Sequence, residues 1–406
     1  MEHWNEAKIK DFAEVKGGKR LPKGKQLIKE PNSHPYIRIR DLGKAKYLQL
    51  NSEYEYVDDE TQKTIARYIV NTGDILISVV GTIGLIGIVG STLDKANQTE
   101  NCDKIVNIHG INPEYLYYYL VSNLGQEEIK RGTVGAVQPK LPLKNVLDIT
   151  VKYPSILEQE RIVTILSVID EKIAVNEKIN NNLQQQLHAI FKARFTDNPE
   201  LERMTQIPLS ELCHVITKGT TPTTFGKPFV ESGINFIKAE SISDNHSIDK
   251  SKFAYIDEET NALLKRSIIQ IGDIVFTIAG TLGRFALIDE NVIPANTNQA
   301  VAIIRANADK VLPEYIYTCF IGEWHTDYYA KRVQQAVQAN LSLGTIKSLP
   351  IPMLNNEEMN EYIQLIHPLI KAIKGNERQN ENLEALRNTL MPKLMSGEID
   401  VSDIQF

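Results

Sequence analysis

The sequence lacks the residue patterns on which disulfide, metal and nucleotide chemistry usually depends. Its three cysteines are far apart and odd in number, which excludes a disulfide framework and a CxxC metal pair. The eight histidines show no HxxxH or HExxH spacing, so a zinc site is not expected. The glycine-rich stretch 81–90 has neither the GxxxxGK[ST] nor the GxGxxG order, and an Asn-Pro-Pro-Tyr motif is missing. We therefore expect no catalytic residue, no metal site and no cofactor in this chain.

Long apolar runs and a positive net charge are also absent. No stretch approaches the ~20 apolar residues of a membrane helix, and the first twelve residues have no apolar core of the signal-peptide kind. We therefore expect a cytoplasmic protein without membrane contact. The net charge of −6 argues against a protein that coats nucleic acid by bulk electrostatics. Residues 1–50 nevertheless hold twelve Lys or Arg against six Asp or Glu, which fits either solvated surface or a local basic face.

The sequence does contain an internal repeat whose period is about half the chain. Short apolar strands, glycine turns and a helix start recur in the same order in both halves. The recurring blocks are GDILIS and GTIG at 73–84 with GDIVFT and GTLG at 272–283, PEYLY at 113–117 with PEYIY at 313–317, and AVQPKL at 136–141 with AVQANL at 336–341. Each half therefore carries one copy of the same structural plan.

Two long runs with helical periodicity, 156–195 and 357–395, follow the two copies. Apolar residues recur at steps of three and four, which is typical of a helix that packs against another helix. At about 1.5 Å per residue the first run gives a helix on the order of 50–60 Å long, a length that suits a spacer. The seam positions are Ile162, Ile165, Ile169, Asn176, Asn180, Leu183 and Ile190, then Ile366, Ile373, Asn380, Leu383 and Leu390. Seam asparagines can fix register, and we expect Asn176 and Asn180 to face the region of Asn376 and Asn380.

These features predict a mixed α/β protein with pseudo-twofold symmetry. It contains two repeated globules, each followed by a long helix, and the second long helix is the expected partner of the first. We place the first globule at 1–154, the central spacer helix at 155–197, the second globule at 198–352 and the C-terminal spacer helix at 353–406. Pro368 removes a backbone donor inside the second helix, so we expect this helix to be kinked or divided.

Side chains suited to nucleic acid recur at similar places in the two copies. Arg, Lys, Asn and Gln can read base edges, while Thr and backbone amides at glycine turns suit phosphates. Each of these residues, taken singly, is equally compatible with an ordinary surface position. Their recurrence at similar places in both copies favours a shared role. The first-copy candidates are Lys19, Arg20, Lys23, Lys25, Arg38, Arg40, Thr82, Arg131, Gln138 and Lys140, with Arg38 and Arg40 assigned to a strand. The second-copy candidates are Lys218, Thr220, Thr221, Thr223, Lys238, Thr281, Arg284, Lys331, Arg332, Gln338 and Asn340.

The two copies agree in glycines, strands and helices but differ in the polar residues of their turns. This pattern indicates one scaffold that reads two different targets. Agreement of the scaffold alone also fits a pseudo-symmetric binder of two identical protein partners.

Several segments resemble the specificity (S) subunit of type I restriction-modification systems, and the resemblance covers essentially the whole chain. They are the GDI strand with its GTxG turn, the segments around Gln138 and Gln338, KGTTP at 218–222, PSILEQERI at 154–162 and LMPKLMSGEI at 390–399. The resemblance implies that each globule is a target-recognition domain for one half of a split double-stranded DNA sequence. It implies that the two helices pair as an antiparallel coiled coil, set the distance between the halves and dock the partners.

The resemblance also implies a chain without activity of its own. Its partners would be two adenine methyltransferase (M) subunits and restriction/translocase (R) subunits, and those partners would use S-adenosylmethionine, ATP and Mg. Two other interpretations remain open at this point. A stand-alone regulator with two DNA-binding lobes would bind its DNA without partners. A structural adaptor would show no salt-dependent affinity for DNA.

Overall fold

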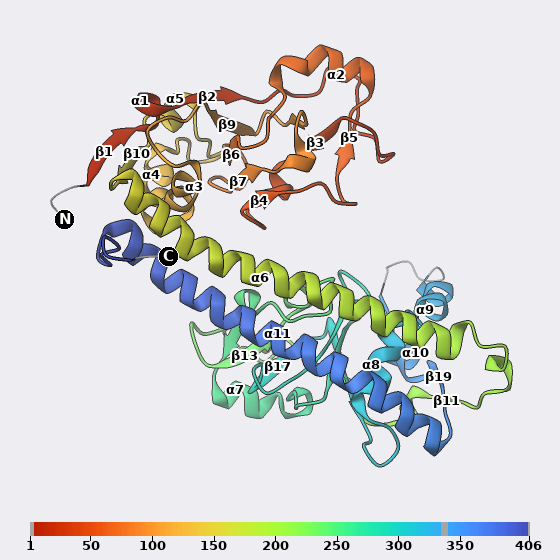
Figure 1. Ribbon diagram of the computed structural model, residues 1–406. Coiled ribbons are helices and arrows are strands. Elements are labelled where there is room, and N and C mark those ends of the chain that lie inside the picture. Colours follow the sequence, from red (N-terminus) through yellow and green to blue (C-terminus); the bar gives the residue numbers. More distant parts are fainter. Residues whose placement is uncertain (1–3, 334–339, 405–406) are drawn as a thin grey trace. The chain divides into compact units, whose positions relative to one another are not determined.

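The computed structural model describes residues 4–333 and 340–404. Contacts divide the chain into two compact units, Met1–Ile173 with Asn382–Phe406, and Ala174–Glu381. Each unit contains one α/β globule and one portion of each of two long helices, α6 (Ile156–Phe191) and α11 (Asn356–Ser396) (Figure 1). The domain boundaries expected from the sequence, at 154, 197 and 352, divide the chain in another way, because they separate the globules from the helices. These boundaries stay a prediction.

The main sheet of the first unit has five strands. Their order is β2 (Glu14–Gly17), β9 (Cys102–Val106), β6 (Ile75–Ser78), β7 (Ile86–Val89) and β4 (Tyr47–Leu48). All neighbours are antiparallel except β4 and β7. Both faces of β6 and β7 are buried, which explains why their sequences are apolar except for Ser78 at the end of β6. The turn between them holds Gly81 and Gly84 at φ +79° and +85°, a left-handed conformation that glycine adopts without strain.

The described part of the first globule also contains a smaller sheet, a strand pair, five α-helices and short 3-10 turns. The smaller sheet has the order β5 (Glu55–Tyr56), β3 (Pro35–Ile37), β8 (Asn97–Gln98), and the pair joins β1 (Asn5–Lys8) to β10 (Thr150–Tyr153). The helices are α1 (Ile9–Phe12), α2 (Asp59–Ile65), α3 (Pro113–Val121), α4 (Asn123–Gly132) and α5 (Leu143–Leu147). Helix α3 begins with proline, as the sequence predicts, and Asn112 caps it through the backbone amides of Glu114 and Tyr115.

The second unit repeats this plan. Its sheets have the orders β12 (Cys213–Lys218), β18 (Val301–Ala306), β15 (Ile274–Thr277), β16 (Phe285–Leu287), and β14 (Ala254–Ile256), β13 (Ile234–Ile237), β17 (Ala295–Thr297). Its strand pair is β11 (Gln206–Pro208) with β19 (Pro350–Pro352), and its short helices are α7 (Glu258–Leu263), α8 (Pro313–Ile321), α9 (Thr326–Val333) and α10 (Leu343–Lys347). The predicted mixed α/β fold with two repeated globules is therefore confirmed.

Each main sheet separates two apolar cores. In the first unit, Ile75 and Ile77 of β6 pack into the core that contains α3, whereas Leu76 packs into a core on the opposite face. In the second unit, Phe276 of β15 joins the core that contains α8, and Val275 joins the opposite one. Alternate side chains of a strand point to opposite faces, so one apolar strand serves both cores. Strands β6 and β15 are therefore rigid supports for the loops at their ends.

Helices α6 and α11 pack in opposite directions within each unit (Figure 1). In the second unit, Asn176 Nδ2 donates to Asn380 Oδ1 at 2.8 Å, and Asn376 Nδ2 donates to Asn180 Oδ1 at 2.8 Å. In the first unit, an Arg387 guanidinium donates to a carboxylate oxygen of Asp170 at 2.8 Å. The antiparallel pairing is confirmed, and the asparagines meet as the sequence predicts. All twelve seam residues are buried or half-buried.

The expected division of the second helix at Pro368 is wrong, because α11 is a single helix from Asn356 to Ser396, whereas a kink there stays a prediction. Proline removes one hydrogen bond and costs about 3 kcal/mol in a helix interior. Ile366, Ile370 and Ile373 around it are at most 4% exposed and belong to the large core of the second unit. Fully burying three such side chains contributes about 1.5–3 kcal/mol each, so packing outweighs the local defect.

Candidate nucleic-acid interface

Four loop segments meet at one end of the main sheet in the first unit. Gly18 donates its amide to the Cys102 carbonyl at 3.1 Å, which places the 18–20 turn beside the start of β9. Val79 donates to the Asn101 carbonyl at 2.8 Å, and Leu141 donates to the Val79 carbonyl at 2.8 Å. We call segments 18–20, 79–84, 98–101 and 134–141 the first loop cluster. Residues far apart in sequence therefore share one edge of the sheet.

The second unit builds a similar arrangement. Gly219 donates to the Asn298 carbonyl at 3.1 Å, Ile278 donates to the Ala300 carbonyl at 2.8 Å, and Leu341 donates to the Ile278 carbonyl at 2.9 Å. Segments 219–221, 278–283, 298–300 and 340–341 form the second loop cluster. The bonds of Ile278 and Leu341 match those of Val79 and Leu141. Gly219 instead bonds three residues before Val301, the counterpart of Cys102, and the side chains of the two clusters differ.

The clusters bring together about half of the predicted DNA-contacting residues. The first cluster contains Lys19, Arg20, Thr82, Gln138 and Lys140, and Arg131 lies just before it in α4. The second cluster contains Thr220, Thr221, Thr281 and Asn340, and Lys218 and Arg284 adjoin it. The others lie elsewhere: Lys23, Lys25, Arg38, Arg40, Thr223, Lys238 and Lys331. Gln338 lies outside the described residues, and Arg332 is placed only as a member of α9. Which of them contact DNA stays a prediction.

Most of the predicted arginines already have a carboxylate partner, which sequence reasoning missed. Arg20 Nε lies 2.6 Å from Glu100 Oε1, and Arg284 contacts both carboxylate oxygens of Asp244 at 2.5 and 2.7 Å. Other pairs are Arg38 with Glu55, Arg40 with Glu55, Arg131 with Glu128, and Lys25 with Asp58 and Glu60. These carboxylates orient the cations and compete with phosphate for them.

Arg38 and Arg40 do not lie in a strand, contrary to the sequence prediction. Strand β3 ends at Ile37, and the chain then turns through Ile39–Asp41. The Asp41 carboxylate causes the turn, because it accepts the backbone amide of Arg38 at 2.7 Å. A short-range hydrogen bond therefore ends the strand one residue before Arg38.

Lysines without a carboxylate partner offer the freer positive charges. Among the residues that the structure describes, Lys19, Lys23, Lys140, Lys218 and Lys331 are exposed and make no ion pair. A lysine ammonium acts as a point charge on phosphate, with little dependence on base sequence. Lys238 differs, since its ammonium lies 3.9 Å from Glu240 and 5.0 Å from the ring centroid of Phe229.

Asp103 is a buried carboxyl at the edge of the first loop cluster. It is 5% exposed, and its Oδ2 has no hydrogen-bond partner in the part of the chain that the structure describes. Burial raises the pKa of Asp103 to about 6. Ala302 occupies the same place between β12 and β15 in the second copy. The carboxyl therefore distinguishes the first cluster from the second.

The raised pKa of Asp103 predicts a pH-dependent loss of stability. Its folded pKa lies above its unfolded value, so its contribution is complete below about pH 4 and is lost as the pH rises through about 6. The Asp103→Asn variant is expected to lack this loss, which we place on the order of 1–2 kcal/mol after allowing for hydration. Urea unfolding between pH 4 and 8 measures it, with Asp309→Asn, at an exposed site, as control. Parallel pH profiles for the wild type and Asp103→Asn would contradict the prediction.

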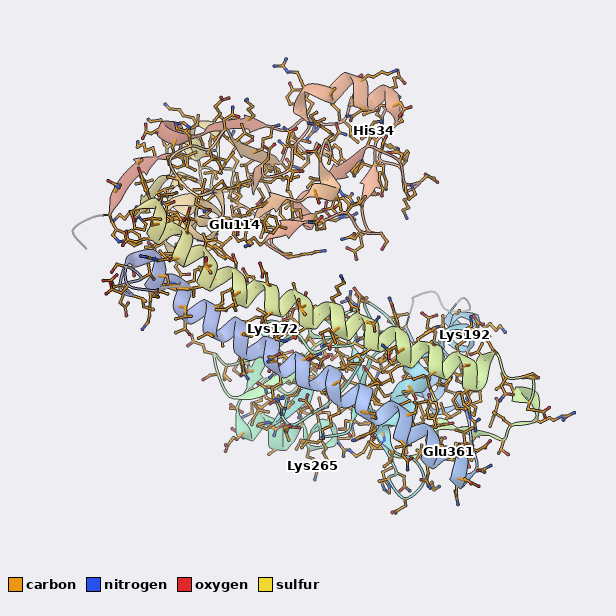
Figure 2. The ribbon with its side chains drawn as sticks, viewed as in Figure 1. His34, Glu114, Lys172, Lys192, Lys265 and Glu361 are labelled. Carbon is orange, nitrogen blue, oxygen red and sulfur yellow. The ribbon has the colours of Figure 1, made fainter. Side chains whose placement is uncertain are left out.

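A partly buried polar network ties the first globule to α6. Lys46, whose side chain is 8% exposed, donates to Glu114 Oε2 at 2.5 Å and to Ser167 Oγ at 2.8 Å. Tyr118 donates its hydroxyl to Asp170 Oδ2 at 2.6 Å. Figure 2 shows Glu114 where the globule meets the helix. Burial raises the pKa of Glu114, but hydrogen bonds from its neighbours, Lys46 first among them, outweigh burial and lower it overall.

The described residues offer no site for metal chemistry. Within 4–333 and 340–404, no three His, Cys, Asp or Glu side chains are grouped so that they could hold a metal ion. In the same ranges no helix combines the length and the hydropathy needed to cross a membrane.

Comparison with known proteins gives consistent matches along the chain. A family model described as the type I restriction modification DNA specificity domain matches residues 1–185 and 202–385. The type I restriction enzyme MjaIX specificity subunit of Methanocaldococcus jannaschii is 26% identical, over 99% of this chain and 94% of that protein. The type I restriction enzyme HindI specificity subunit of Haemophilus influenzae is 22% identical, over 72% of this chain and 79% of that protein.

A solved structure has a similar fold. The S subunit of a type I restriction-modification system from M. genitalium aligns with a TM-score of 0.54 and 16% identity, over 96% of each chain. The two segments matched by the family model each contain one globule of the repeat and together cover most of the chain. The chain therefore belongs to the type I restriction-modification DNA specificity domain family.

Proposed function

We propose that this chain is the sequence-specific DNA-recognition subunit of a type I restriction-modification complex. The observation that carries the proposal is the pair of loop clusters, which share two of their three linking backbone hydrogen bonds and differ in side chains. Each globule then reads one half of a bipartite double-stranded target. Arg, Lys, Gln and Asn of the clusters can contact base edges, and the exposed lysines can contact phosphates.

The helices α6 and α11 act in this proposal as a ruler and as a docking frame. Helix α6 exposes apolar side chains that its own unit leaves uncovered: Leu157 at 62% and Val168 at 60% in the first unit, Val175 at 50% and Ile179 at 42% in the second. Exposed apolar residues at helical spacing fit partner helices. We propose two methyltransferase subunits as these partners, joined by restriction/translocase subunits.

The chain contributes recognition, and its partners supply the chemistry. In this proposal S-adenosylmethionine, ATP and Mg act in the methyltransferase and restriction subunits, and the complex works in the cytoplasm. The partners also supply part of the positive charge that binding to DNA requires, which reconciles the net charge of −6 with a DNA-binding role.

Mapping methylated adenines in cells that carry this chain and its methyltransferase tests the proposal. We expect two short half-sites separated by an unread spacer of constant length. A chimaera whose residues 198–352 come from the M. jannaschii relative should change one half-site and keep the other. A single continuous motif, or a chimaera that changes both halves, would contradict the proposal.

A further inference from the structure

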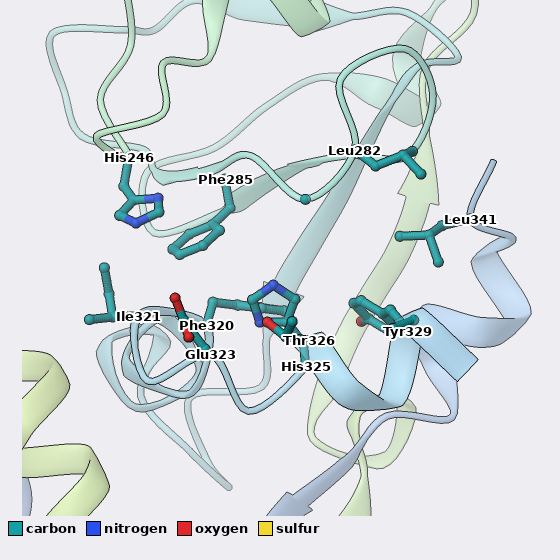
Figure 3. Close-up of a pocket in the computed structure, with 12 residues that line it drawn as sticks. His246, Leu282, Phe285, Phe320, Ile321, Glu323, His325, Thr326, Tyr329 and Leu341 are labelled. Atoms are coloured by element: carbon teal, nitrogen blue, oxygen red, sulfur yellow. The ribbon is translucent and has the colours of Figure 1, made fainter. Parts of the chain in front are cut away.

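The second unit contains a cavity of about 420 Å³ beside the 280–283 turn (Figure 3). Aromatic rings dominate its walls, among them Phe285, Phe320 and Tyr329. His246 stacks on Phe285 with 4.0 Å between ring centroids and 17° between planes, and His325 meets Phe285 edge-on at 6.0 Å. A cavity with such walls suits a flat ring.

Three polar atoms on these walls lack hydrogen-bond partners among the residues that the structure describes. They are Nδ1 of His246, Nδ1 of His325 and the hydroxyl of Tyr329. His325 is 8% exposed and Tyr329 is 4% exposed, so both are more than nine-tenths buried. Buried polar groups are nearly always hydrogen-bonded. Three unpaired polar atoms on the walls of one cavity therefore indicate that a polar ligand binds there and supplies their hydrogen-bond partners.

The charge of the cavity limits the class of ligand. Burial lowers the pKa of His246 and of His325 to about 4, so at neutral pH each imidazole offers one donor and one acceptor nitrogen. Glu323 also lines the cavity and adds negative charge. Neutral donors and acceptors beside a carboxylate disfavour phosphate. They suit an uncharged heterocycle that carries both donors and acceptors.

Backbone conformation singles out the same place. His246 at φ +63° and Glu323 at φ +56° are non-glycine residues in the left-handed region, and both line the cavity. Such conformations cost free energy and cluster at ligand sites. Strain and unpaired polar atoms therefore coincide on one cavity.

The first copy fills the equivalent position with its own side chains. Gln126 of α4 donates from Nε2 to the carbonyls of Gly84 at 3.0 Å and Leu120 at 2.8 Å. Ile129 stands where the second copy has Tyr329. The polar cavity is thus a property of the second copy, as expected of a feature that serves one half-site.

We propose that this cavity binds a nucleobase, with Tyr329 and His325 bonded to its polar edge and Phe285 contributing an aromatic wall. The base can come from a free nucleoside or from DNA bound to the second globule, turned out of its stack. The DNA source rests on the proposed function, and the nucleoside source does not.

Two experiments distinguish the sources. In the first, saturation-transfer NMR measures binding of the four 2′-deoxynucleosides to the full chain. The second experiment measures the affinity of the complete methyltransferase complex for a series of duplexes of its mapped target. Each duplex has an abasic site opposite a different base of the second half-site. A base without its partner leaves the stack more easily, so one such duplex is expected to bind roughly tenfold more tightly than the intact target.

Three variants make the test specific. Tyr329→Phe removes the unpaired hydroxyl, and Ala330→Phe places a ring at an exposed position that lines the cavity. Tyr328→Phe is the matched control, because its hydroxyl bonds to the Ser348 carbonyl at 2.7 Å outside the cavity. We expect Tyr329→Phe to weaken nucleoside binding, or to reduce the abasic gain, roughly five- to tenfold.

Each outcome decides the inference. Nucleoside binding that both cavity variants reduce and Tyr328→Phe keeps supports the free source. The DNA source is supported if the duplex with an abasic site binds more tightly than the intact target, both cavity variants reduce this difference, and Tyr328→Phe keeps it. If neither signal depends on Tyr329 or Ala330, the inference is overturned. The proposed function still stands in that case, provided that the complex binds its intact bipartite target.

Discussion

Replacing Lys46 with methionine is expected to lower the free energy of unfolding of the first unit by about 3 kcal/mol near pH 7. Methionine keeps the length of the side chain, so the change removes charge and hydrogen bonds with little loss of volume. It leaves the Glu114 carboxylate without the ammonium that contacts it at 2.5 Å. Unfolding in urea, followed for the full chain, measures the effect.

The pair Lys44–Glu53 provides the control for Lys46. Their side chains are 65% and 67% exposed and lie 3.5 Å apart, so Lys44→Met should change stability by less than about 1 kcal/mol. The double variant Lys46→Met with Glu114→Gln should regain part of the loss, since no uncompensated charge remains. Equal changes in the free energy of unfolding for Lys46→Met and Lys44→Met would contradict this prediction.

The effect of Lys46→Met should also depend on pH. The folded pKa of Glu114 is lowered, so the ion pair stabilises the fold above the unfolded pKa of this glutamate and is lost as the pH falls through the folded value. The difference between wild type and Lys46→Met is therefore expected to shrink in acid.

Gly18→Ala is expected to destabilise the first unit by about 2–3 kcal/mol and to weaken reading of the first half-site. A Cβ at Gly18 would lie 2.0 Å from the carbonyl oxygen of Thr99, a backbone atom that cannot rotate away. The 18–20 turn would have to move from the 98–101 segment, which would separate Lys19 and Arg20 from the rest of the first loop cluster.

Gly17 and Gly219 allow the matched comparison. A Cβ at Gly17 meets only the Asp103 carboxylate, at 3.4 Å, so Gly17→Ala should be nearly neutral. A Cβ at Gly219 would lie 1.8 Å from the Thr297 carbonyl oxygen, so Gly219→Ala should affect the second half-site alone. The effect of each variant on each half-site is measured by methylation of DNA targets in which one half-site at a time is altered. Equal effects of Gly17→Ala and Gly18→Ala would contradict the argument.

The fold was predictable where its cause is local and repeated. The glycine turn between β6 and β7 and the proline at the start of α3 depend on a few adjacent residues, and each appears twice in the sequence. The seam of α6 and α11 follows from helical spacing alone, and its asparagines predicted the partners that the structure shows. Pro368 was misjudged because a local rule was applied where burial against a core decides.

The candidate interface was less predictable because its partners are distant in sequence. Glu100 pairs with a residue 80 positions away, and Asp244 with one 40 positions away, so no spacing rule links them. The acidic stretch near Glu55 holds Lys25, Arg38 and Arg40 through ion pairs that the sequence did not reveal. The available signal in the sequence was the acidic stretch near Glu55, which directly follows the excess of Lys and Arg in residues 1–50.

The cavity residues carried little sequence signal. His325 and Tyr329 are one helical turn apart, whereas His246 comes from a distant loop that only folding brings to the same cavity. Differences between the copies offered a partial clue, since Ile129 and Tyr329 occupy equivalent positions and differ in polarity.

The asparagine contacts of the second unit have an evolutionary consequence. Asn176 donates to Asn380, and Asn376 donates to Asn180, so exchanging the two halves of the sequence maps one hydrogen bond onto the other. Such an interface is isologous: each helix presents the same surface to its partner. Two separate copies of an ancestral half-length chain could have met through these same amides before a duplication joined them. In that ancestor both globules would have been identical and its target a palindrome.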